Sequence, residues 1–502
     1  MKQNALLRFT KRCQIVALFI ALAGHLSADT SVRSIREWVK GDGQTDDTAG
    51  VTRAFAACRG NAFTLRVDCP VFIHVGTDIS KPIFVDSKTH VLFTNAGLFI
   101  TDNVMIPTFV ITDSSDISFT DMKLEYRGGL PVNRDVGGYY SGGVFVPRPN
   151  GYAQPSFAFS DQTLTSWLKA NRNIAFGKTK GAARSTPWAG PTNLSSIFIF
   201  VGDVHDVTFT GTRMFVSPST GGDKFIPMAF SFTIGYDANQ GPVLLDEKAG
   251  WAVVPNVSVP HKICFTDTVL DGYYMGFQGV LQNATFSEIV GKRCGDLQDA
   301  AGNNVGGIGK WFAPPHLFYI NYYKNLWDDR RLASKNLSIL NVKDIGPRVG
   351  TARDVSATMQ RSGYANSLKI GAIDSSVSNY TSTRPDGLAD ILSCDNLTLA
   401  NISGTYDSSF IHDIYPGVRF PADGGYKHLT LNNVVLTDEA ENPYKTSTNG
   451  LPFGGNSRLG NEAIKFNQVA VNLNRWSCPW NLQPNFTGLD VQVSILFNIK
   501  NP

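Results

Sequence analysis

The fold is decided by a segment near the start of the chain, Gly41-Asp42-Gly43-Gln44-Thr45-Asp46-Asp47-Thr48, followed directly by Ala49-Gly50-Val51-Thr52-Arg53-Ala54-Phe55-Ala56-Ala57-Cys58. The glycines permit a tight turn, and Asp46, Asp47 and Thr48 can cap free backbone N–H groups at the start of a helix. The apolar residues that follow fall on one side at helical spacing. The segment therefore predicts a turn followed by a short amphipathic helix.

Short alternating strands recur along the rest of the chain, and many are followed by Asn, Asp or Gly. From Phe265 onward the anchor residues of these strands stand at positions 265, 286, 318, 339, 370, 399 and 431. Repeats of 20–50 residues are typical of stacked architectures. Each coil would hydrogen-bond to the next as parallel strands around an apolar interior. A β-propeller is the alternative, but it needs four strands in each blade at more regular spacing.

The GDGxTDDT string and its short Ala-rich helix resemble the N-terminal cap of the pectate-lyase-like superfamily. Members of that superfamily are right-handed parallel β-helices, and they include polysaccharide lyases, polygalacturonase-type glycoside hydrolases, epimerases and phage tailspikes. The resemblance implies an all-β chain that forms a right-handed parallel β-helix, or solenoid, with the short helix as its N-terminal cap. It also implies that the aspartates of the motif are structural. Residues 440–502, which are irregular and rich in Pro and Asn, are expected to form an irregular C-terminal cap.

Residues 1–28 have the layout of a secretory signal peptide: a basic stretch, an apolar run from Cys13 to Ala23, and small residues at Ser27 and Ala28. The apolar run is too short for a comfortable transmembrane span, so we expect no stable membrane insertion after cleavage. An uncleaved anchor is the alternative. The sequence thus predicts a secreted or periplasmic protein with one β-helix domain, residues 29–502. Stretches near 127–196 and 218–262, rich in Gly, Pro and aromatic residues, are expected to be loop insertions.

Charge and cysteine content exclude some classes of protein. Removing residues 1–28 takes away four basic and no acidic residues, so the formal charge moves from +3 to −1. We expect no nucleic-acid partner, because such binding usually requires a strong basic excess. Cys58 and Cys69 are the best candidates for a disulfide, since they are close in sequence and lie where the helix should meet the first strands. Two buried free thiols are the alternative. No pair of cysteines has the spacing of a zinc site.

Loops after the strands should stack on one side of the solenoid if the coils are aligned on their anchors. These loops are rich in Tyr, Arg and Asp, and a polysaccharide could lie across them. A polysaccharide is therefore the expected partner. The candidate substrate-binding residues are Tyr273, Arg293, Tyr319, Arg353, Tyr380 and Asp390.

Two reactions suit a polysaccharide that lies across these loops. Hydrolysis of a glycosidic bond needs two carboxylates, one as general acid and one as base or nucleophile. β-Elimination instead needs a base beside a uronate carboxyl group and a cation that neutralises this carboxylate. The candidate catalytic residues are Asp296, Asp299 and Asp386 for hydrolysis, and His316 and Arg348 for elimination.

The chain departs from the catalytic motifs of the superfamily. Of the polygalacturonase-type motifs, only Arg384-Pro385-Asp386-Gly387 is similar to a part, and the Asp-Pro-His-Asp motif of alginate epimerases is absent. Calcium is possible in this superfamily but is not indicated here, so we expect no cofactor and no metal site. The sequence predicts a secreted polysaccharide-degrading enzyme, with glycoside hydrolysis ahead of elimination. A non-catalytic glycan-binding protein or adhesin is the alternative from another class.

Overall fold

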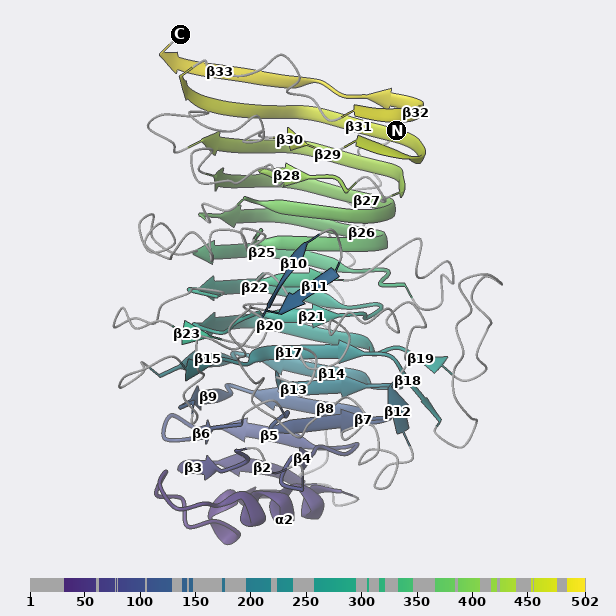
Figure 1. The fold of residues 1–502 in the computed structure, drawn as a ribbon. Coiled ribbons are helices and arrows are strands. Elements are labelled where there is room, and N and C mark those ends of the chain that lie inside the picture. The colour runs from purple at the N-terminus through teal and green to yellow at the C-terminus, as the bar shows by residue number, and fades with distance from the viewer. Residues whose placement is uncertain are drawn as a thin grey trace.

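The computed structural model describes residues 31–59, 63–76, 78, 80–103, 106–128, 138–141, 144–147, 174–176, 196–217, 224–237, 257–294, 305–306, 316–320, 333–345, 366–383, 387–406, 417–421, 425–438, 453–454, 456–475 and 485–501. Most of these residues belong to one stack of parallel strands, which the helix α2 (Thr48–Cys58) covers at its N-terminal end (Figure 1). The predicted all-β parallel β-helix with a short N-terminal helix is confirmed.

Three strand columns run along the stack. In the first, each strand pairs in parallel with the next. Its members are β1 (Ser31–Ser34), β2 (Phe63–Val67), β5 (His90–Phe93), β8 (Ser115–Thr120), β14 (His205–Thr210), β20 (His261–Asp271), β22 (Thr285–Lys292), β25 (Ser338–Ile345), β26 (Leu368–Ser382), β27 (Ala389–Tyr406), β29 (Gly425–Asp438) and β31 (Asn456–Arg475).

The second column begins as separate short strands and then merges with the first at β20. Its separate members are β3 (Pro70–Ile73), β6 (Leu98–Thr101), β9 (Lys123–Tyr126) and β15 (Arg213–Val216). The last described coil is formed by β32 (Asn485–Gln492) and β33 (Ile495–Asn501), which both pair with β31.

The third column is the one that concerns function. Its strands again pair in parallel, and the first residues of β26 and β27 belong to it. The other members are β4 (Ile83–Phe84), β7 (Phe109–Thr112), β13 (Ser196–Val201), β17 (Met228–Thr233), β21 (Phe277–Gly279), β24 (Phe318–Ile320), β28 (Val418–Arg419) and β30 (Phe453–Gly454).

Short strands outside the three columns lie in the two predicted insertions and one later loop. They are β10 (Gly138–Ser141), β11 (Val144–Pro147), β12 (Ile174–Phe176), β16 (Lys224–Phe225), β18 (Gly235–Asp237), β19 (Val257–Ser258) and β23 (Val305–Gly306). The stretch near 218–262 is not wholly an insertion, because it also contributes β17 to the third column.

The interior of the stack contains two ladders of phenylalanine rings. In the first column, the rings of consecutive coils lie 4.9–5.3 Å apart and nearly parallel. In the third column, the corresponding centroid distances are 4.6–5.4 Å. These distances are close to the spacing of hydrogen-bonded strands, about 4.8 Å, so one apolar position per coil yields a continuous packed core. The ladders comprise Phe119, Phe209, Phe265 and Phe286, and Phe109, Phe198, Phe230, Phe277 and Phe318.

The bend between the first and second columns is made by residues in the left-handed region. Glu288, Asn341, Asn379, Asn401 and Asn433 stack there with φ between 53° and 55°. The side-chain amide of each asparagine donates to the side-chain oxygen one coil below, over 2.5–3.1 Å. Asparagine tolerates this backbone conformation better than other residues with a side chain, and its amide can both donate and accept. We call this stack the asparagine ladder.

The aspartates of the N-terminal motif are structural, as the resemblance implied. The carboxylate of Asp47 accepts hydrogen bonds from the backbone of Lys40 and Gly41, at 2.8 and 3.0 Å. It makes no capping bond to the helix, contrary to the simple prediction, and Asp46 binds the N–H of Thr48 instead. Asp42 accepts from the N–H groups of Thr45 and Gln44 and from Lys40, and these contacts hold the pKa of its carboxyl well below the usual value.

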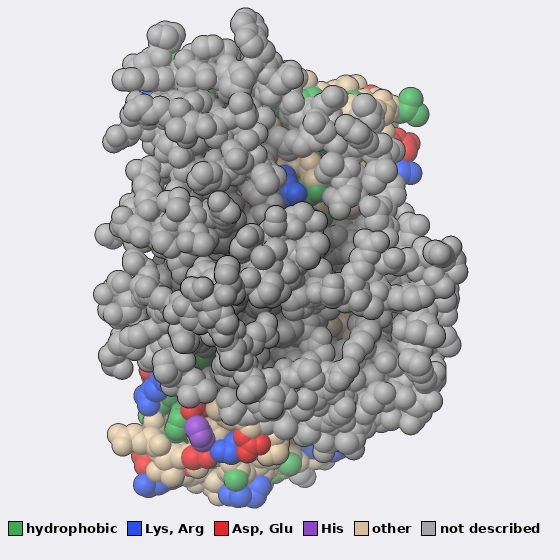
Figure 2. All heavy atoms as spheres, in the orientation of Figure 1, with side chains coloured by type: hydrophobic (Ala, Val, Ile, Leu, Met, Phe, Trp, Pro, Cys, Tyr) green, Lys and Arg blue, Asp and Glu red, His purple; other side chains and the backbone are tan. Residues whose placement is uncertain are grey.

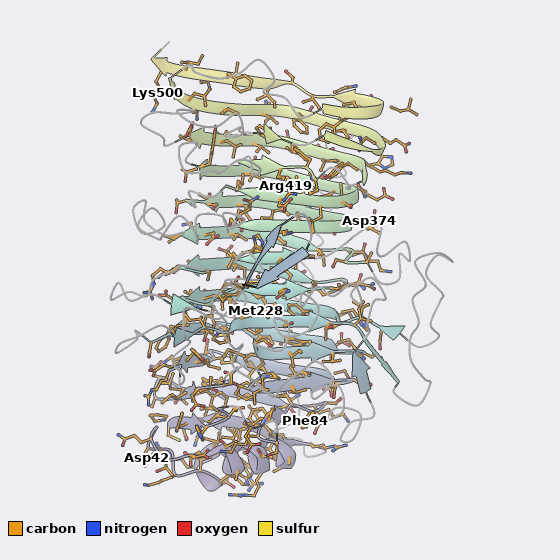
Figure 3. The ribbon with its side chains drawn as sticks, in the orientation of Figure 1. Asp42, Phe84, Met228, Asp374, Arg419 and Lys500 are labelled. Carbon is orange, nitrogen blue, oxygen red and sulfur yellow. The ribbon has the colours of Figure 1, made fainter. Side chains whose placement is uncertain are left out.

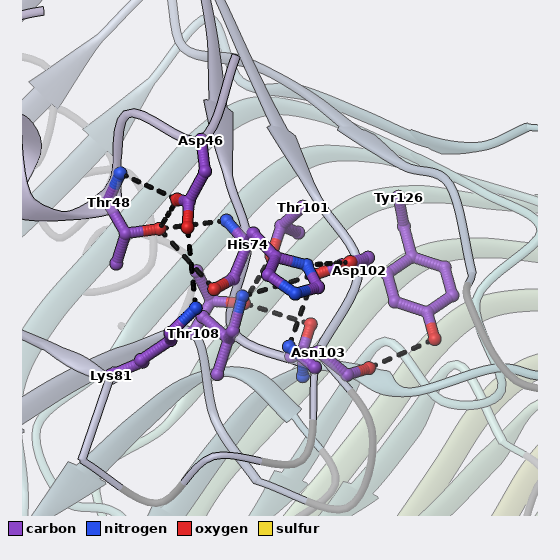
Figure 4. Close-up of polar contacts among 11 residues, drawn as sticks. Asp46, Thr48, His74, Lys81, Thr101, Asp102, Asn103, Thr108 and Tyr126 are labelled. Carbon is purple, nitrogen blue, oxygen red and sulfur yellow. Dashed lines mark hydrogen bonds and ion pairs between the residues drawn. The ribbon is translucent and has the colours of Figure 1, made fainter. Parts of the chain in front are cut away.

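A polar network ties this motif to the first coils. The hydroxyl of Thr48 accepts from the backbone of His74, whose ring lies 2.5 Å from a carboxylate oxygen of Asp102 (Figure 4). Asp102 also accepts from the N–H groups of Val75 and Gly76. Charged and histidine side chains gather at this end of the stack in the view of Figure 2. The network accounts for these acidic residues without any catalytic role.

The C-terminal region differs from the predicted irregular cap. Residues 456–475 and 485–501 form β31, β32 and β33, which extend the stack (Figure 1). The inward residues Ile464, Phe466, Val469, Val471 and Leu473 are buried and keep the pattern of the earlier coils. Asparagine and proline content was therefore a misleading sign, because asparagine in this protein marks bends between strands.

The predicted disulfide between Cys58 and Cys69 is wrong, because both thiols are free and buried. Cys58 closes the buried side of α2, whereas Cys69 lies against the backbone of Gly41, where it fills the space a side chain would occupy. The two cysteines pack against different neighbours.

Among the described residues, no helix is long and apolar enough to cross a membrane.

The asparagine ladder can be tested at Asn379. Asn379→Gly removes its two side-chain hydrogen bonds but keeps the left-handed backbone favourable, whereas Asn379→Ala adds backbone strain of about 1–2 kcal/mol. We expect urea denaturation to give a lower free energy of unfolding for the alanine variant than for the glycine variant. Asn432→Ala, on the same sheet but outside the ladder, should change stability little. Equal stability of the two Asn379 variants would contradict this account.

The cysteine assignment can be tested by alkylation. Burial raises the pKa of the Cys58 thiol to about 11, which opposes formation of the reactive thiolate near neutral pH. We expect Cys58 and Cys69 to resist alkylation in the folded protein and to react fully after denaturation without reductant, as read by mass spectrometry. Cys264, which is only half-buried, should react earlier. Peptides joined by a disulfide between Cys58 and Cys69 would restore the original prediction.

Candidate functional site

The candidate site is a row of side chains that point outward from the third strand column. Six consecutive strands each contribute one of them, and the inward neighbours of each belong to the core. Pairing of β17, β21, β24, β26, β27 and β28 brings the six residues into direct succession. We call this set the outer row: Ser231, Gln278, Tyr319, Lys369, Asp390 and Arg419.

The outer row is elongated. Six strands give five steps of about 4.8 Å, so the row is about 24 Å long. Figure 3 labels Phe84, Met228 and Arg419, which belong to strands of the third column and mark its course along the stack. A straight row of this length matches an extended polymer better than a compact small molecule.

Charge is concentrated at the C-terminal end of the row. One carboxylate oxygen of Asp390 lies 3.6 Å from the ammonium of Lys369 and 3.6 Å from the guanidinium of Arg419. The Asp390 side chain is 5% exposed, and those of Lys369 and Arg419 are 14% and 24% exposed. Two cations thus flank one acid in a largely dehydrated place.

Tyr319 joins the charged end to an aromatic and apolar region. The Lys369 ammonium lies 4.6 Å from the centre of the Tyr319 ring. On its other side, Tyr319 packs against a small buried cluster that includes Tyr274 and Met275. The ring of His316 meets Tyr319 edge-on at 5.3 Å, and the Nδ1 atom of His316 lies 2.5 Å from the carbonyl oxygen of Asn366.

Burial opposes the charged form of Lys369, but the interactions with Tyr319 and Asp390 outweigh it, so the pKa of Lys369 is raised. The ammonium therefore stays protonated across the physiological range. A permanent cation at this position can attract an anionic group of a ligand.

Several buried polar atoms along the row have no hydrogen-bond partner. They are the hydroxyl oxygen of Ser231, Oε1 of Gln278 and Oδ1 of Asp390, and the hydroxyl of nearby Tyr274 is in the same condition. Buried polar groups in folded proteins almost always have partners, and one left unpaired costs about 1–3 kcal/mol. Other buried polar atoms off the row are also without a printed partner, so the row is distinguished by the succession of its polar side chains on paired strands.

The structure brings together only part of the predicted site. Tyr319 and Asp390 belong to the outer row, and His316 lies beside them but is fully buried, so it is suited to hold Tyr319 in position. Arg293 lies at the end of β22, outside the third column, where it pairs with Asp271 over 2.6 Å. The remaining candidates lie outside the described residues: Asp296, Asp299, Arg348, Arg353 and Asp386.

Tyr273 and Tyr380, which the sequence predicts as substrate-binding residues, have rings that are fully buried in the core. The hydroxyl of Tyr380 lies 2.6 Å from that of Ser367, which in turn donates to a carboxylate oxygen of buried Asp344. The prediction placed both in outward loops, whereas each follows a bend that turns the side chain inward.

Sequence reasoning missed Ser231, Gln278, Lys369 and Arg419. A signal was present, because a charged residue stands between two core residues in Leu368-Lys369-Ile370, Ala389-Asp390-Ile391 and Val418-Arg419-Phe420. The sequence places the candidate site in loops after strands, whereas these side chains lie within strands. No group of three metal-ligating side chains occurs in the part of the chain that the structure describes.

The fold and the outer row together define a class: a parallel β-helix with an elongated row of polar side chains on one sheet. No protein-family model matches this chain, and no curated protein matches it.

Solved structures are similar at low sequence identity. A mannuronan C-5 epimerase A-module of Azotobacter vinelandii shares 9% identity, with 93% of this chain and 94% of that chain covered at a TM-score of 0.47. The Streptococcus pneumoniae surface adhesin PfbA shares 10% identity, with 94% of this chain and 92% of that chain covered at a TM-score of 0.37. A polygalacturonase from Erwinia carotovora shares 10% identity, with 95% of this chain and 98% of that chain covered at a TM-score of 0.33. We assign no activity from these likenesses.

The role of Lys369 can be tested through the pH dependence of stability. Because the folded-state pKa is raised above the unfolded value of about 10.4, the stabilisation is present below that pH and is lost as pH rises through the folded-state pKa. We expect Lys369→Met to be less stable at neutral pH and to lose less stability above about pH 10.4 than the unmodified protein. Lys343→Met, at an exposed site, is the matched control. If the free energy of unfolding of the two variants depended on pH in the same way, the role assigned to Lys369 would be contradicted.

Proposed function

We propose that this protein is an exported polysaccharide-degrading enzyme, and that its substrate lies along the outer row. The observation that carries the proposal is the series of buried, unpartnered polar atoms on Ser231, Gln278 and Asp390. Sugar hydroxyls could donate to the unpaired oxygen atoms of Gln278 and Asp390 and could pair with Ser231. A chain of sugars would thus meet the hydrogen-bonding needs of several consecutive strands.

Hydrolysis, which the sequence predicts first, requires two carboxylates. Asp390 is the carboxylate of the outer row, but it is engaged by Lys369 and Arg419. Asp386 is the candidate for the second one, because it stands four residues before Asp390 in the chain. Hydrolysis is therefore tested through Asp386 as well as Asp390.

A specific observation favours β-elimination as the second candidate reaction. Lys369 and Arg419 are two cations that could neutralise a uronate carboxylate, and the Tyr319 hydroxyl lies on the strand next to Lys369. In this reaction a base removes the proton beside the carboxyl group, the bond to the leaving glycosidic oxygen breaks, and a carbon–carbon double bond forms. The departing oxygen takes up a proton, and no water is consumed.

Export is part of the same proposal. The basic and apolar pattern of residues 1–28 supports a secretory signal, and a secreted or periplasmic location gives access to extracellular glycans. A non-catalytic adhesin would use the same row only to bind the glycan.

Incubation of the purified mature protein with a panel of polysaccharides tests this function. New reducing ends without ultraviolet absorbance from an unsaturated uronate would indicate hydrolysis, and both signals together would indicate elimination. We expect Asp390→Asn and Arg419→Gln each to reduce turnover by about tenfold or more, the value of one charge-assisted hydrogen bond. Lys343→Met, outside the row, should retain activity.

Full turnover by the Asp390 and Arg419 variants would show that the outer row takes no part in the reaction. Binding of a polysaccharide without either product signal would instead identify a glycan-binding protein. If the unmodified protein releases reducing ends without unsaturated uronate, loss of that release in Asp386→Asn would support Asp386 as the second carboxylate of hydrolysis.

A further inference from the structure

Two histidine rings stack on neighbouring coils of the first column. His205 is the first residue of β14 and His261 is the first residue of β20, and the pairing of these strands places the two residues opposite each other. Their ring centroids lie 5.0 Å apart, with 26° between the ring planes. The side chains are 31% and 28% exposed, so solvent reaches both rings. The outer row lies on the third column, so this pair is a separate feature of the molecule.

A hydrogen bond fixes the position of the proton on the His261 ring. The Nδ1 atom lies 3.2 Å from the carbonyl oxygen of Val259, and a carbonyl oxygen can only accept. Nδ1 therefore carries the proton. In the neutral ring the lone pair is then on Nε2.

The His205 ring is oriented in the same way by a carboxylate. Its Nδ1 atom lies 2.7 Å from Oδ2 of Asp206. This hydrogen bond is the main cause that lowers the pKa of the Asp206 carboxyl, which is therefore ionised at neutral pH and can only accept. The ammonium of Lys262 lies 3.7 Å from the other carboxylate oxygen, Oδ1, and so leaves the contact with His205 in place. Both rings thus present Nε2 as an electron-pair donor.

This arrangement is typical of histidines that bind a metal. Such histidines almost always donate the other ring N–H to a carboxylate or a backbone carbonyl, which orients the ring and makes the ligating nitrogen more basic. Imidazole nitrogens suit Zn²⁺, Cu²⁺ and Ni²⁺, whereas Ca²⁺ and Mg²⁺ prefer oxygen. Because zinc–nitrogen distances are about 2.0–2.1 Å, one ion can hold two nitrogen atoms about 4 Å apart or closer. The stacked rings need to converge only slightly at their Nε2 edges to meet this limit.

We propose that His205 and His261 form a binding site for one divalent transition-metal ion, such as Zn²⁺ or Cu²⁺, with water as the remaining ligands. The ion links two successive coils, and it stabilises the stack because the two nitrogen atoms are held together only in the folded chain. Two ligating side chains make a weaker site than the three or four of most zinc sites. This inference does not depend on the proposed function.

Isothermal titration calorimetry of the metal-free protein with ZnCl₂ tests the site. We expect a single equivalent of Zn²⁺ to bind, and His205→Gln and His261→Gln each to abolish this binding. Asp206→Asn should weaken it by about tenfold or more, because the carboxylate orients His205. His428→Gln is the matched control and should bind as the unmodified protein does, since His428 also has an aspartate partner, Asp395 at 3.2 Å, but lies on β29. CaCl₂ should not displace the bound Zn²⁺.

Electron paramagnetic resonance with Cu²⁺ gives a second readout. We expect the spectrum of the unmodified protein to show two nitrogen ligands, and those of the His205 and His261 variants to show fewer. Thermal denaturation checks that each variant folds, and Zn²⁺ should raise the Tm of the unmodified protein and of His428→Gln but not of His205→Gln. The inference is overturned if the unmodified protein does not bind Zn²⁺ saturably, if folded His205→Gln binds it equally well, or if the copper spectrum shows no nitrogen ligand. None of these outcomes bears on polysaccharide turnover.

Discussion

The structure depends on in-register hydrogen bonding between parallel strands of successive coils. This pairing places equivalent residues of neighbouring coils about 4.8 Å apart, so every position is repeated as a line of side chains along the stack. A line can be stable only if its members tolerate one another at that distance. Phenylalanine rings do so by stacking, asparagines by exchanging amide hydrogen bonds, and opposite charges by pairing. The same constraint therefore produces the core, the bends and the outer row.

The fold could be predicted because its signals are local and repeated. The Gly41–Thr48 motif specifies a turn and helix that cover one end, and alternating anchors report the inward positions of each coil. The C-terminal coils are not predicted, because a high asparagine content is usually typical of irregular chain. In this fold asparagine at a bend is instead a sign of order, as Asn379 and Asn401 illustrate.

The site could be predicted only in part, because its residues meet through pairing that the sequence does not state. Tyr319 and Asp390 were identified, but their neighbours Lys369 and Arg419 were not, since nothing local distinguishes an outward charge on one column from one on another. The inward position of Tyr273 and Tyr380 is not predicted, for a related reason. A single bend in the left-handed region changes which side of the strand faces the core, and the position of such bends fixes whether a tyrosine is inside or outside.

The asparagine ladder also bears on how such a protein could change in size. Asn379 and Asn401 are 22 residues apart and occupy the same place in consecutive coils. Duplication or loss of a segment of that length would add or remove one coil and would preserve every line of stacked side chains. The length of the outer row could thus evolve by whole coils, with the spacing between neighbouring side chains held constant by the backbone.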